Sequence, residues 1–517
     1  MGRRAILRRR HRQQGGYRQM NNRWIKLLRK KTKEFAAAKE ETFETKVEPS
    51  EYRKPIFQII YIFLGIFVLM AGYFSYYIMF QSDDVINNAY NKRQEVLSER
   101  VVRGQILSAD RAILAQTVVD KDGNETREYP YGEVYAHAIG RYSKGKTGIE
   151  ESENIRLLTS NINSIEVMYS DLSGKKSPGD NVVTTLDSKL QEVAYNALGD
   201  NRGAVVVMEA STGKILAMAS KPSYDPGKVD DQWEELLADE KTEAPLLNRA
   251  TQGLYPPGST FKILTALEYM RENMAYLEYE YDCDGSIDFE GMTIHCHNNR
   301  SHGEVDLPKS FAKSCNTSFA NIGKGLDIAK FYEMCDSFLF NQNLPVNMAS
   351  NVSSFTLQKG VSGTKEAMQT AIGQGNTLIS PLHNAMITAS VANEGVMMKP
   401  YIVDHIENAE GATVKKYSSQ TIGRMMSGEE ADYISDMMRQ VVTDGTATKL
   451  EDLPVEVAGK TGSADNSKGK AHSWFVGFAP DREKDTDIVV SIIVENVGTG
   501  SEYAVPIARK IFKEYFK

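Results

Sequence analysis

The sequence has no overall excess of positive charge, no internal repeats and few cysteines. Its 517 residues carry a formal net charge of −7, and the pI calculated from the sequence is about 5.8. This balance gives no indication of a nucleic-acid partner, and none is expected. A chain of this length is expected to fold into two or three domains.

Charged side chains are also absent from Pro55 to Phe80, where Gln58 is the only strongly polar residue. As a helix this stretch would be roughly 39 Å long, against a hydrocarbon core of about 30 Å. The preceding residues 1–54 hold 17 Lys and Arg against 6 Glu, and such an excess marks the cytoplasmic side. The run predicts a single-pass anchor in the plasma membrane. It is too long for a cleaved signal peptide, no A-x-A site follows it, and a buried core helix rarely has so basic a flank.

The composition predicts four segments along the chain. Residues 1–54 form a basic cytoplasmic tail, 55–80 the transmembrane helix, 81–175 a polar juxtamembrane pedestal, and 176–517 an extracytoplasmic catalytic domain. The basic tail either binds anionic lipid or a cytoplasmic partner, or is a disordered tail that only sets the orientation.

Within residues 176–517 the hydrophobic pattern changes between strand-like and helix-like. Asp187 is an expected helix N-cap, and a turn at 211–213 separates two apolar strands of a hairpin. Helices between this hairpin and three late strands predict an α/β fold of the α+β type, with one mixed sheet covered on both faces. The expected strands are 181–186, 203–208, 214–219, 455–458, 474–479 and 488–494, and the expected helices run from 187 to 198, from Ser259, from near Asp306, from near Pro381 and from 504 to 515.

A nucleophile and a base are indicated where Pro256-Pro-Gly258 precedes a helix. Ser259 opens this helix and Lys262 lies three residues on, so both side chains share one helix face. A lysine in a low-dielectric site flanked by cations can be neutral near pH 7. Lys262 is therefore the candidate general base for attack by Ser259. Whether the lysine is the only base is debated for sites of this kind.

The order of three motifs is more specific than Ser-x-x-Lys alone. Ser314-Cys-Asn316 lies 55 residues after Ser259, and Lys460-Thr-Gly462 lies 201 residues after it, whereas a second Lys-Thr-Gly at Lys146 precedes every candidate nucleophile. This ordered set is known from serine acyl transfer on D-alanyl substrates. Ser-x-x-Lys also occurs at Ser143, Ser173, Ser211, Ser310, Ser362 and Ser467.

The second motif is expected to move a proton and to orient the base. Ser314 can relay a proton toward the leaving amine, and Asn316 can orient Lys262 and the substrate amide. The alternative is that Ser314 and Asn316 are helix caps.

The third motif is expected to bind a terminal carboxylate of the substrate. Lys460 supplies positive charge and Thr461 a hydroxyl for this carboxylate, and Gly462 lets the substrate lie alongside the strand. Backbone N–H groups of Ser259 and Ser463 would meet the oxyanion. The alternative for Lys460 is an edge-strand charge that resists aggregation.

The cysteines leave two alternatives open. Cys283 and Cys296 are close enough in sequence to form a disulfide, or they are free buried thiols. Cys296 also lies among His295, His297 and His302, but this spacing fits no standard zinc pattern. No metal is therefore expected. The other two cysteines are Cys315 and Cys335.

At these motifs the sequence resembles a class B penicillin-binding protein, over nearly all of the chain after the membrane segment. The stretch before the catalytic domain is too short for the glycosyltransferase domain of a class A protein. The segments that carry the resemblance include Arg103-Gly-Gln-Ile106, Gly145-Lys-Thr-Gly-Ile-Glu150, Pro222-Ser-Tyr-Asp-Pro226, Tyr255-Pro-Pro-Gly-Ser-Thr-Phe-Lys262, His302-Gly303, Ile372-Gly-Gln-Gly375 and Trp474-Phe-Val-Gly477.

The resemblance implies a DD-transpeptidase/β-lactamase-like fold, with a central antiparallel sheet flanked by helices and the nucleophile at a helix start in a groove. It implies an enzyme that forms a serine acyl-enzyme on the D-Ala–D-Ala of peptidoglycan stem peptides, cross-links them, is acylated by β-lactam antibiotics and needs no cofactor. It also implies a partner, a membrane glycosyltransferase of the shape, elongation, division and sporulation type. A role in cell shape, cell division or sporulation is left open.

Three other functions use similar motifs. A β-lactamase or β-lactam sensor is disfavoured because only Glu333 and Glu366 lie between the second motif and residue 380, neither in a Glu-x-x-Leu-Asn context. A DD-carboxypeptidase stays open because the choice of acceptor depends on groove shape. A non-catalytic scaffold predicts loss of a motif residue, and none is lost.

Overall fold

The membrane segment predicted from the sequence is a single helix, α2 (Arg53–Phe80). Its residues Ile56–Tyr77 have a mean hydropathy of 2.2 and none of them is buried within the protein, so the helix is long and apolar enough to cross a membrane. The computed structural model describes residues 53–80, 93–163, 166, 168, 172–240, 242–465 and 469–517. The basic tail up to residue 52, with its expected roles, lies outside them. Residues 1–83 and 84–517 form two separate units.

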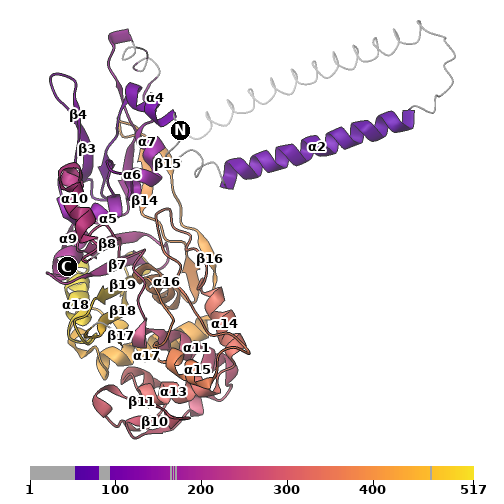
Figure 1. The fold of residues 1–517 in the computed structure, drawn as a ribbon, viewed down its shortest axis with the longest axis vertical. Helices are drawn as coiled ribbons and strands as arrows, with labels where there is room; N and C mark the ends of the chain where they lie inside the picture. Colours follow the sequence, from indigo (N-terminus) through magenta and orange to yellow (C-terminus); the bar gives the residue numbers. More distant parts are fainter. Residues whose placement is uncertain are drawn as a thin grey trace, which may run out of the picture. The chain divides into compact units, whose positions relative to one another are not determined.

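The pedestal is built around a six-stranded sheet that two distant parts of the chain share. Its elements are α4 (Arg93–Arg100), β1 (Val101–Val102), β2 (Ile106–Leu107), β3 (Ile113–Val119), β4 (Glu125–Glu128), η1 (Gly132–Val134), α5 (Ala136–Ile139), α6 (Gly148–Ser152), α7 (Asn154–Leu157), β5 (Ser177–Pro178), β6 (Asn181–Thr184), β14 (Val403–Glu407) and β15 (Thr413–Lys416). The strand order is β15-β14-β6-β2-β3-β4. The sequence analysis assigned β6, β14 and β15 to the catalytic domain, whereas in the structure all three belong to the pedestal sheet. Figure 1 shows β14 and β15 beside the pedestal elements.

A buried ion network joins the two pedestal segments that carried the family resemblance. Glu150 is fully buried on α6, and its Oε2 lies 2.5 Å from Arg103 Nη2 while its Oε1 lies 2.8 Å from Arg127 Nε. Arg103 also donates to Asn154 Oδ1 at 2.6 Å. Burial alone would raise the pKa of Glu150, but Arg103 and Arg127 together outweigh it and hold this pKa below its ordinary value. The network therefore ties segment 103–106 to segment 145–150.

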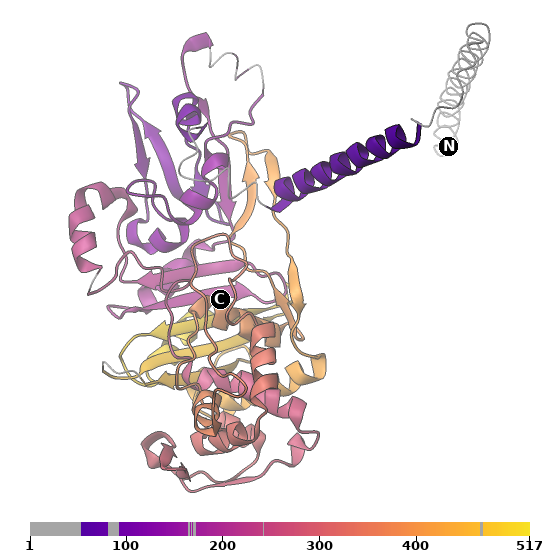
Figure 2. The same ribbon diagram turned by 45° about the vertical axis from the view of Figure 1, so that its right-hand side comes forward.

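The catalytic domain is centred on a five-stranded sheet with the order β17-β18-β19-β7-β8. Its strands are β7 (Gly203–Glu209), β8 (Ile215–Lys221), β17 (Ala458–Ala464), β18 (His472–Asp481) and β19 (Thr486–Val494). Every neighbouring pair is antiparallel. The mixed sheet expected from the order of elements is therefore wrong, and the antiparallel sheet implied by the resemblance is confirmed. Figure 2 shows these strands side by side across the domain.

Helices cover both faces of this sheet. α9 (Ser188–Ala197) and α18 (Ala504–Tyr515) pack on each other and against the sheet, and α16 (Pro381–Ala392) packs against β7, β18 and β19 on the side opposite α18 (Figure 1). Nearly all side chains of β7, β18 and β19 are buried as a result. The Asp187 carboxylate accepts from Leu190 N at 2.8 Å and so caps α9 as predicted.

The remaining elements of the domain form its lower part in Figure 1 and the connections to the pedestal. They are η2 (Pro226–Lys228), α10 (Val229–Asp239), η3 (Gly258–Phe261), α11 (Lys262–Glu272), η4 (Tyr276–Glu278), β9 (Tyr281–Cys283), β10 (Ser286–Phe289), β11 (Met292–His295), η5 (His297–Asn299), β12 (Gly303–Val305), α12 (Leu307–Ala312), α13 (Asn316–Gly325), α14 (Ile328–Ser337), α15 (Thr364–Ala371), β13 (Val396–Met398), β16 (Thr421–Arg424), α17 (Gly428–Thr443) and η6 (Thr448–Leu450).

Two predicted boundaries differ from the structure. The run 455–458 becomes a strand only at Ala458, and β17 then contains the Lys-Thr-Gly motif itself. Ser259 lies in the 3₁₀ turn η3, and the α-helix α11 begins at Lys262. Such turns are frequent at helix N-termini, so Ser259 still stands at the start of a helix.

Candidate active site

The first motif lies where a tightly packed turn enters α11. Gly258 has a φ of +54°, which glycine adopts without steric cost, and its N–H donates to Gly373 O at 2.9 Å. A Cβ on Gly373 would lie 1.8 Å from Gly258 O, so the two backbones are in direct contact. The indole of Trp474 donates to Pro256 O at 3.0 Å. The turn that presents Ser259 is therefore fastened both to the sheet and to the loop at Gly373.

The second motif brings its polar groups to the ammonium of Lys262. Lys262 Nζ donates to Asn316 Oδ1 at 2.8 Å and to Ser314 O at 2.9 Å, and it lies 3.3 Å from Ser314 Oγ. Asn316 is the first residue of α13, and its Nδ2 donates to His295 O at 3.0 Å. Both ends of the Asn316 amide are thus engaged, which fixes the direction in which its oxygen faces Lys262.

The third motif lies on β17, which stands at the edge of the sheet beside β18. Lys460 Nζ donates to Ser314 Oγ at 2.9 Å and to Thr461 O at 3.2 Å. The hydroxyl of Thr461 is hydrogen-bonded to the hydroxyl of Thr446. Ser314 therefore joins the second motif to the third.

Gly462 and Ser463 bring β17 close to the first motif. A Cβ on Gly462 would lie 3.0 Å from Trp474 Cβ and 3.1 Å from Pro257 O. The absence of a side chain at Gly462 therefore allows β17 to pack against the turn before Ser259. Ser463 Oγ accepts from Gly500 N at 3.3 Å.

Residues of all three motifs line one cleft of about 510 Å³. Within the described residues, the Lys262 ammonium makes no hydrogen bond to the Ser259 hydroxyl, and catalytic hydrogen bonds often tighten only when substrate is bound. The motif residues that line the cleft are Ser259, Ser314, Asn316, Thr461 and Ser463.

The two lysines of the site are fully buried, and within the described part of the chain neither forms an ion pair with a carboxylate. Burial lowers the pKa of Lys262 to about 8, against the opposing influence of the nearby Cys315 and Cys296 thiols. Burial, and then repulsion from Lys262, lowers the pKa of Lys460 well below its ordinary value. A neutral amine is therefore accessible near physiological pH, which is what a general base requires.

Two of the repeated motifs that the sequence analysis set aside, those at Lys146 and Ser211, lie outside this cleft. Lys146 is half-buried in the pedestal, with its Nζ 5.2 Å from the centre of the Tyr142 ring. Ser211 lies in the turn between β7 and β8, where its hydroxyl donates to Thr486 Oγ1 at 2.8 Å. Neither residue lines the cleft.

Comparison with known proteins follows the same division of the chain. Residues 203–513 match the family described as the penicillin-binding protein transpeptidase domain. The chain belongs to this family. Residues 103–182, in the pedestal, match the penicillin-binding protein A dimerisation domain.

Relatives and solved structures agree with this assignment. The chain is 30% identical to peptidoglycan D,D-transpeptidase PbpA of Mycolicibacterium smegmatis, over 83% of this chain and 92% of the relative. The ceftriaxone acyl-enzyme complex of penicillin-binding protein A from M. tuberculosis is 28% identical, with a TM-score of 0.74 over 82% of this chain and 100% of that one. The D,D-transpeptidase domain of a peptidoglycan glycosyltransferase from Eggerthella lenta is 31% identical, with a TM-score of 0.72 over 81% and 98%. The expected class B penicillin-binding protein and its fold are confirmed.

Sequence reasoning missed Thr446, and the structure decides between the two alternatives that it left open for the cysteines. Thr446 belongs to no motif, and its partner Thr461 becomes visible only when the chain after α17 reaches β17. All four cysteines are free thiols, and the Sγ atoms of Cys283 and Cys296 lie 3.7 Å apart, so the disulfide alternative is not formed. His295 and His297 are exposed.

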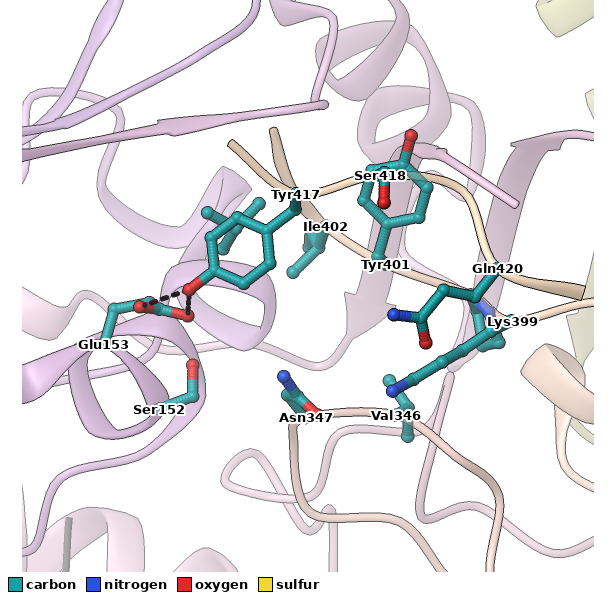
Figure 3. Close-up of a pocket in the computed structure, with 12 residues that line it drawn as sticks. Ser152, Glu153, Val346, Asn347, Lys399, Tyr401, Ile402, Tyr417, Ser418 and Gln420 are labelled. Atoms are coloured by element: carbon teal, nitrogen blue, oxygen red, sulfur yellow. Dashed lines mark hydrogen bonds between the residues drawn. The ribbon is translucent and has the colours of Figure 1, made fainter. Parts of the chain in front are cut away.

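A second pocket of about 60 Å³ lies where the pedestal meets the catalytic domain (Figure 3). Figure 3 shows the ring of Tyr417 pointing toward Glu153, whose carboxylate accepts from the Tyr417 hydroxyl at 2.9 and 3.0 Å. Tyr401, Lys399 and Gln420 lie on the catalytic side. The lining of this pocket includes no motif residue. Tyr417 directly follows β15 and Glu153 directly follows α6, so this hydrogen bond holds the end of the pedestal sheet against the pedestal helices.

Proposed function

We propose that this peptidoglycan D,D-transpeptidase uses Ser259 as its nucleophile and the Lys262 amine as its general base. The activity follows from the family, whereas the residue roles rest on the cleft. The observation that carries them is the position of Ser314 Oγ, which lies 3.3 Å from Lys262 Nζ and 2.9 Å from Lys460 Nζ and lines the cleft together with Ser259.

The reaction begins when Ser259 Oγ attacks the carbonyl carbon of the penultimate D-Ala. Neutral Lys262 accepts the hydroxyl proton, and Ser314 passes a proton to the nitrogen of the terminal D-Ala as the C–N bond breaks. An amine of a neighbouring stem peptide then attacks the acyl-enzyme and forms the cross-link. A β-lactam offers its ring amide to the same serine, so it acylates Ser259 as well.

Substrate binding is assigned to the third motif. Lys460 and the Thr461 hydroxyl bind the terminal carboxylate of the stem peptide, since charge-assisted contacts are the strong ones. The exposed edge of β17 lets the peptide lie alongside it as an added strand. Backbone N–H groups of Ser259 and Ser463 stabilise the oxyanion.

Labelling with a fluorescent penicillin tests the nucleophile. Full-length protein in detergent should be labelled covalently, and Ser259→Ala should abolish labelling. Ser211→Ala is the matched control, because Ser211 also opens a Ser-x-x-Lys sequence but lies in a remote turn, and it should label like the wild type. Labelling that persists in Ser259→Ala would show that another serine is the nucleophile.

The membrane arrangement is part of the same proposal. Helix α2 spans the plasma membrane with residues 1–54 in the cytoplasm, because the Lys and Arg excess precedes the helix. A tag at position 20 should resist external protease in intact cells, and its digestion there would reverse the orientation. Because cross-linking consumes polymerised glycan strands, we also propose a membrane glycosyltransferase of the shape, elongation, division and sporulation type as partner. Recovery of that enzyme with the tagged chain from detergent extracts tests the partnership.

A further inference from the structure

Three cysteines and a histidine converge beside the active-site cleft from four separate segments. Cys283 ends β9, Cys296 follows β11, His302 precedes β12, and Cys315 stands between the two functional residues of the second motif as the N-cap of α13. The possible ligand atoms of these four side chains all lie within 4.8 Å of one another. Cys283, Cys296 and Cys315 are buried, and His302 is half-buried. These four residues are called the cysteine–histidine cluster below.

The spacing of the sulfur atoms matches a tetrahedral metal site. The Sγ atoms of Cys283 and Cys296 are 3.7 Å apart, as are those of Cys296 and Cys315, and Cys283 Sγ lies 3.3 Å from His302 Nδ1. In a tetrahedron with Zn–S bonds of about 2.3 Å, neighbouring sulfurs are about 3.8 Å apart. A disulfide would need an S–S distance of about 2.05 Å.

The surrounding segment contributes few fully buried side chains to the protein core. Between Tyr276 and Val305, the buried hydrophobic side chains are Cys283, Ile294, Cys296 and Val305, so half of them belong to the cluster. The strands here form only two-stranded pairs, β9 with β12 and β10 with β11. Small segments without a sufficient core are commonly stapled by a structural metal. The three cysteines also form a hydrophobic group of their own, with Tyr281 beside it, apart from the main core.

We propose that the cysteine–histidine cluster binds one Zn²⁺ as a closed structural site with a Cys₃His ligand set. Three thiolates and one imidazole are a common donor set of structural zinc, and soft sulfur ligands select it over Mg²⁺ or Ca²⁺. The thiols bind as thiolates and release their protons on binding. This proposal departs from the expectation of no metal, which considered His295 and His297 but not Cys315.

The hydroxyl of Thr317 fits such a site as a hydrogen-bond donor to the ligands. Thr317 Oγ1 lies 3.1 Å from Cys283 Sγ, 3.3 Å from Cys315 Sγ and 3.6 Å from Cys296 Sγ. Outer hydrogen bonds of this kind orient metal ligands. The Ser318 N–H also faces Cys315 Sγ, at 3.5 Å.

The zinc would fasten the second motif to the β9–β12 segment. Cys315 lies next to Asn316, whose Nδ2 donates to the carbonyl of His295, and His295 in turn precedes Cys296. A metal that joins Cys315 to Cys296 therefore closes a ring around this hydrogen bond. The site is structural, because in the proposal all four of its positions are filled by protein ligands.

Metal analysis of the full-length protein, purified in detergent without chelator, tests the proposal. We expect about one zinc per chain by mass spectrometry of the metal, and His302→Ala should retain about a tenth of it or less. His302→Cys restores four ligands and should recover the zinc. Cys335→Ala is the matched control, because Cys335 is a buried cysteine outside the cluster, and it should keep the wild-type zinc content.

Cobalt exchange and thiol counting separate this proposal from its rivals. The Co²⁺-loaded protein should show the strong absorption of tetrahedral cobalt with thiolate charge transfer, which Cys296→Ala should lack. Zinc-free protein that stays metal-free after incubation with Zn²⁺ would overturn the proposal. The proposal would also be overturned if only two of the four thiols react in denatured, unreduced protein, because that result means a disulfide within the cluster. The zinc count does not depend on penicillin labelling, so a failure of the zinc proposal would not affect the proposed role of Ser259, and the reverse also holds.

Discussion

Replacing Glu150 by glutamine should destabilise the pedestal strongly while leaving the cleft unchanged. The side chain is fully buried and faces two buried guanidinium groups, those of Arg103 and Arg127. Glutamine keeps the shape but removes the charge, and one of its ends becomes a donor that meets another donor. Removing one member of a buried ion pair costs about 3–5 kcal/mol, because the remaining charge is left uncompensated.

The expected shift in melting temperature follows from the size of the unit. Residues 84–517 form one unit of about 430 residues, and its unfolding entropy is about 0.9 kcal/mol/K at roughly 2.1 cal/mol/K per residue. A loss of 3–5 kcal/mol then lowers Tm by about 3–6 °C if the unit unfolds cooperatively. The neighbouring Glu151 is exposed, so Glu151→Gln is the matched control and should change the stability by less than about 0.5 kcal/mol.

The assay is a thermal scan of tryptophan fluorescence on full-length protein in detergent, with penicillin labelling at 25 °C as the check on the cleft. The pKa of Glu150 lies below its ordinary value, so its contribution to stability is present above that ordinary value and is lost as the pH falls through the lowered one. The difference between wild type and Glu150→Gln should therefore shrink in acid. A variant that melts within 1 °C of the wild type at pH 7 would refute the idea that this network holds the pedestal together.

Three further predictions concern the cleft and the junction. Lys460→Ala should fold but should be acylated by fluorescent penicillin at least roughly tenfold more slowly, because it loses a charge-assisted contact. Lys146→Ala, in the second Lys-Thr-Gly, is the control and should be acylated at the wild-type rate. Equal rates for both variants would remove Lys460 from the site. Because burial lowers the pKa of Lys262 to about 8, the acylation rate should rise roughly tenfold from pH 7 to pH 9; a flat profile would argue against a lysine base. The same shift means that Lys262 binds fewer protons in the folded than in the unfolded chain between about pH 8 and 10.5, so the contribution of Lys262 to stability should rise with pH across that window. Tyr417→Phe removes the hydroxyl that bonds the buried Glu153 carboxylate in the pocket beside the pedestal sheet, and it should cost about 1–3 kcal/mol in thermal scans. Tyr401→Phe, in the same pocket, is the control, and equal melting of the two variants would exclude the contact as a source of stability.

Most of the secondary structure of the catalytic domain could be predicted from the sequence, because its strands are buried apolar runs and its helices have clear caps. Asp187 and Pro381 mark real helix starts, and the hairpin of β7 and β8 lies where the apolar pattern placed it. The return of β14 and β15 to the pedestal could not be predicted, because strand pairing over more than 200 residues leaves no local signal.

The site was predictable in its members but not in its contacts. Ordered motifs identify Ser259, Ser314 and Lys460, since these residue types must recur in a fixed order to line one groove. The link between the two lysines through a single hydroxyl is a property of the packing, and so is the burial that changes their pKa values. The cysteine–histidine cluster escaped detection because its ligands come from four segments whose spacing resembles no zinc motif.

The backbone conformation of Ser314 indicates how the active site is held in place. Its φ of +56° is a left-handed conformation that a residue with a side chain adopts at a cost of about 1 kcal/mol or more. Two backbone hydrogen bonds enclose it, from Ser314 N to Phe311 O at 3.1 Å and from Cys315 N to Ser310 O at 2.8 Å. Because two buried ammonium groups and a strained residue all reduce stability, the surrounding structure has to compensate for them. Lys460 on the antiparallel sheet holds the second motif on one side through Ser314 Oγ, and on the other side Asn316 is bonded to His295 O, in the segment that the proposed zinc would fasten to Cys315.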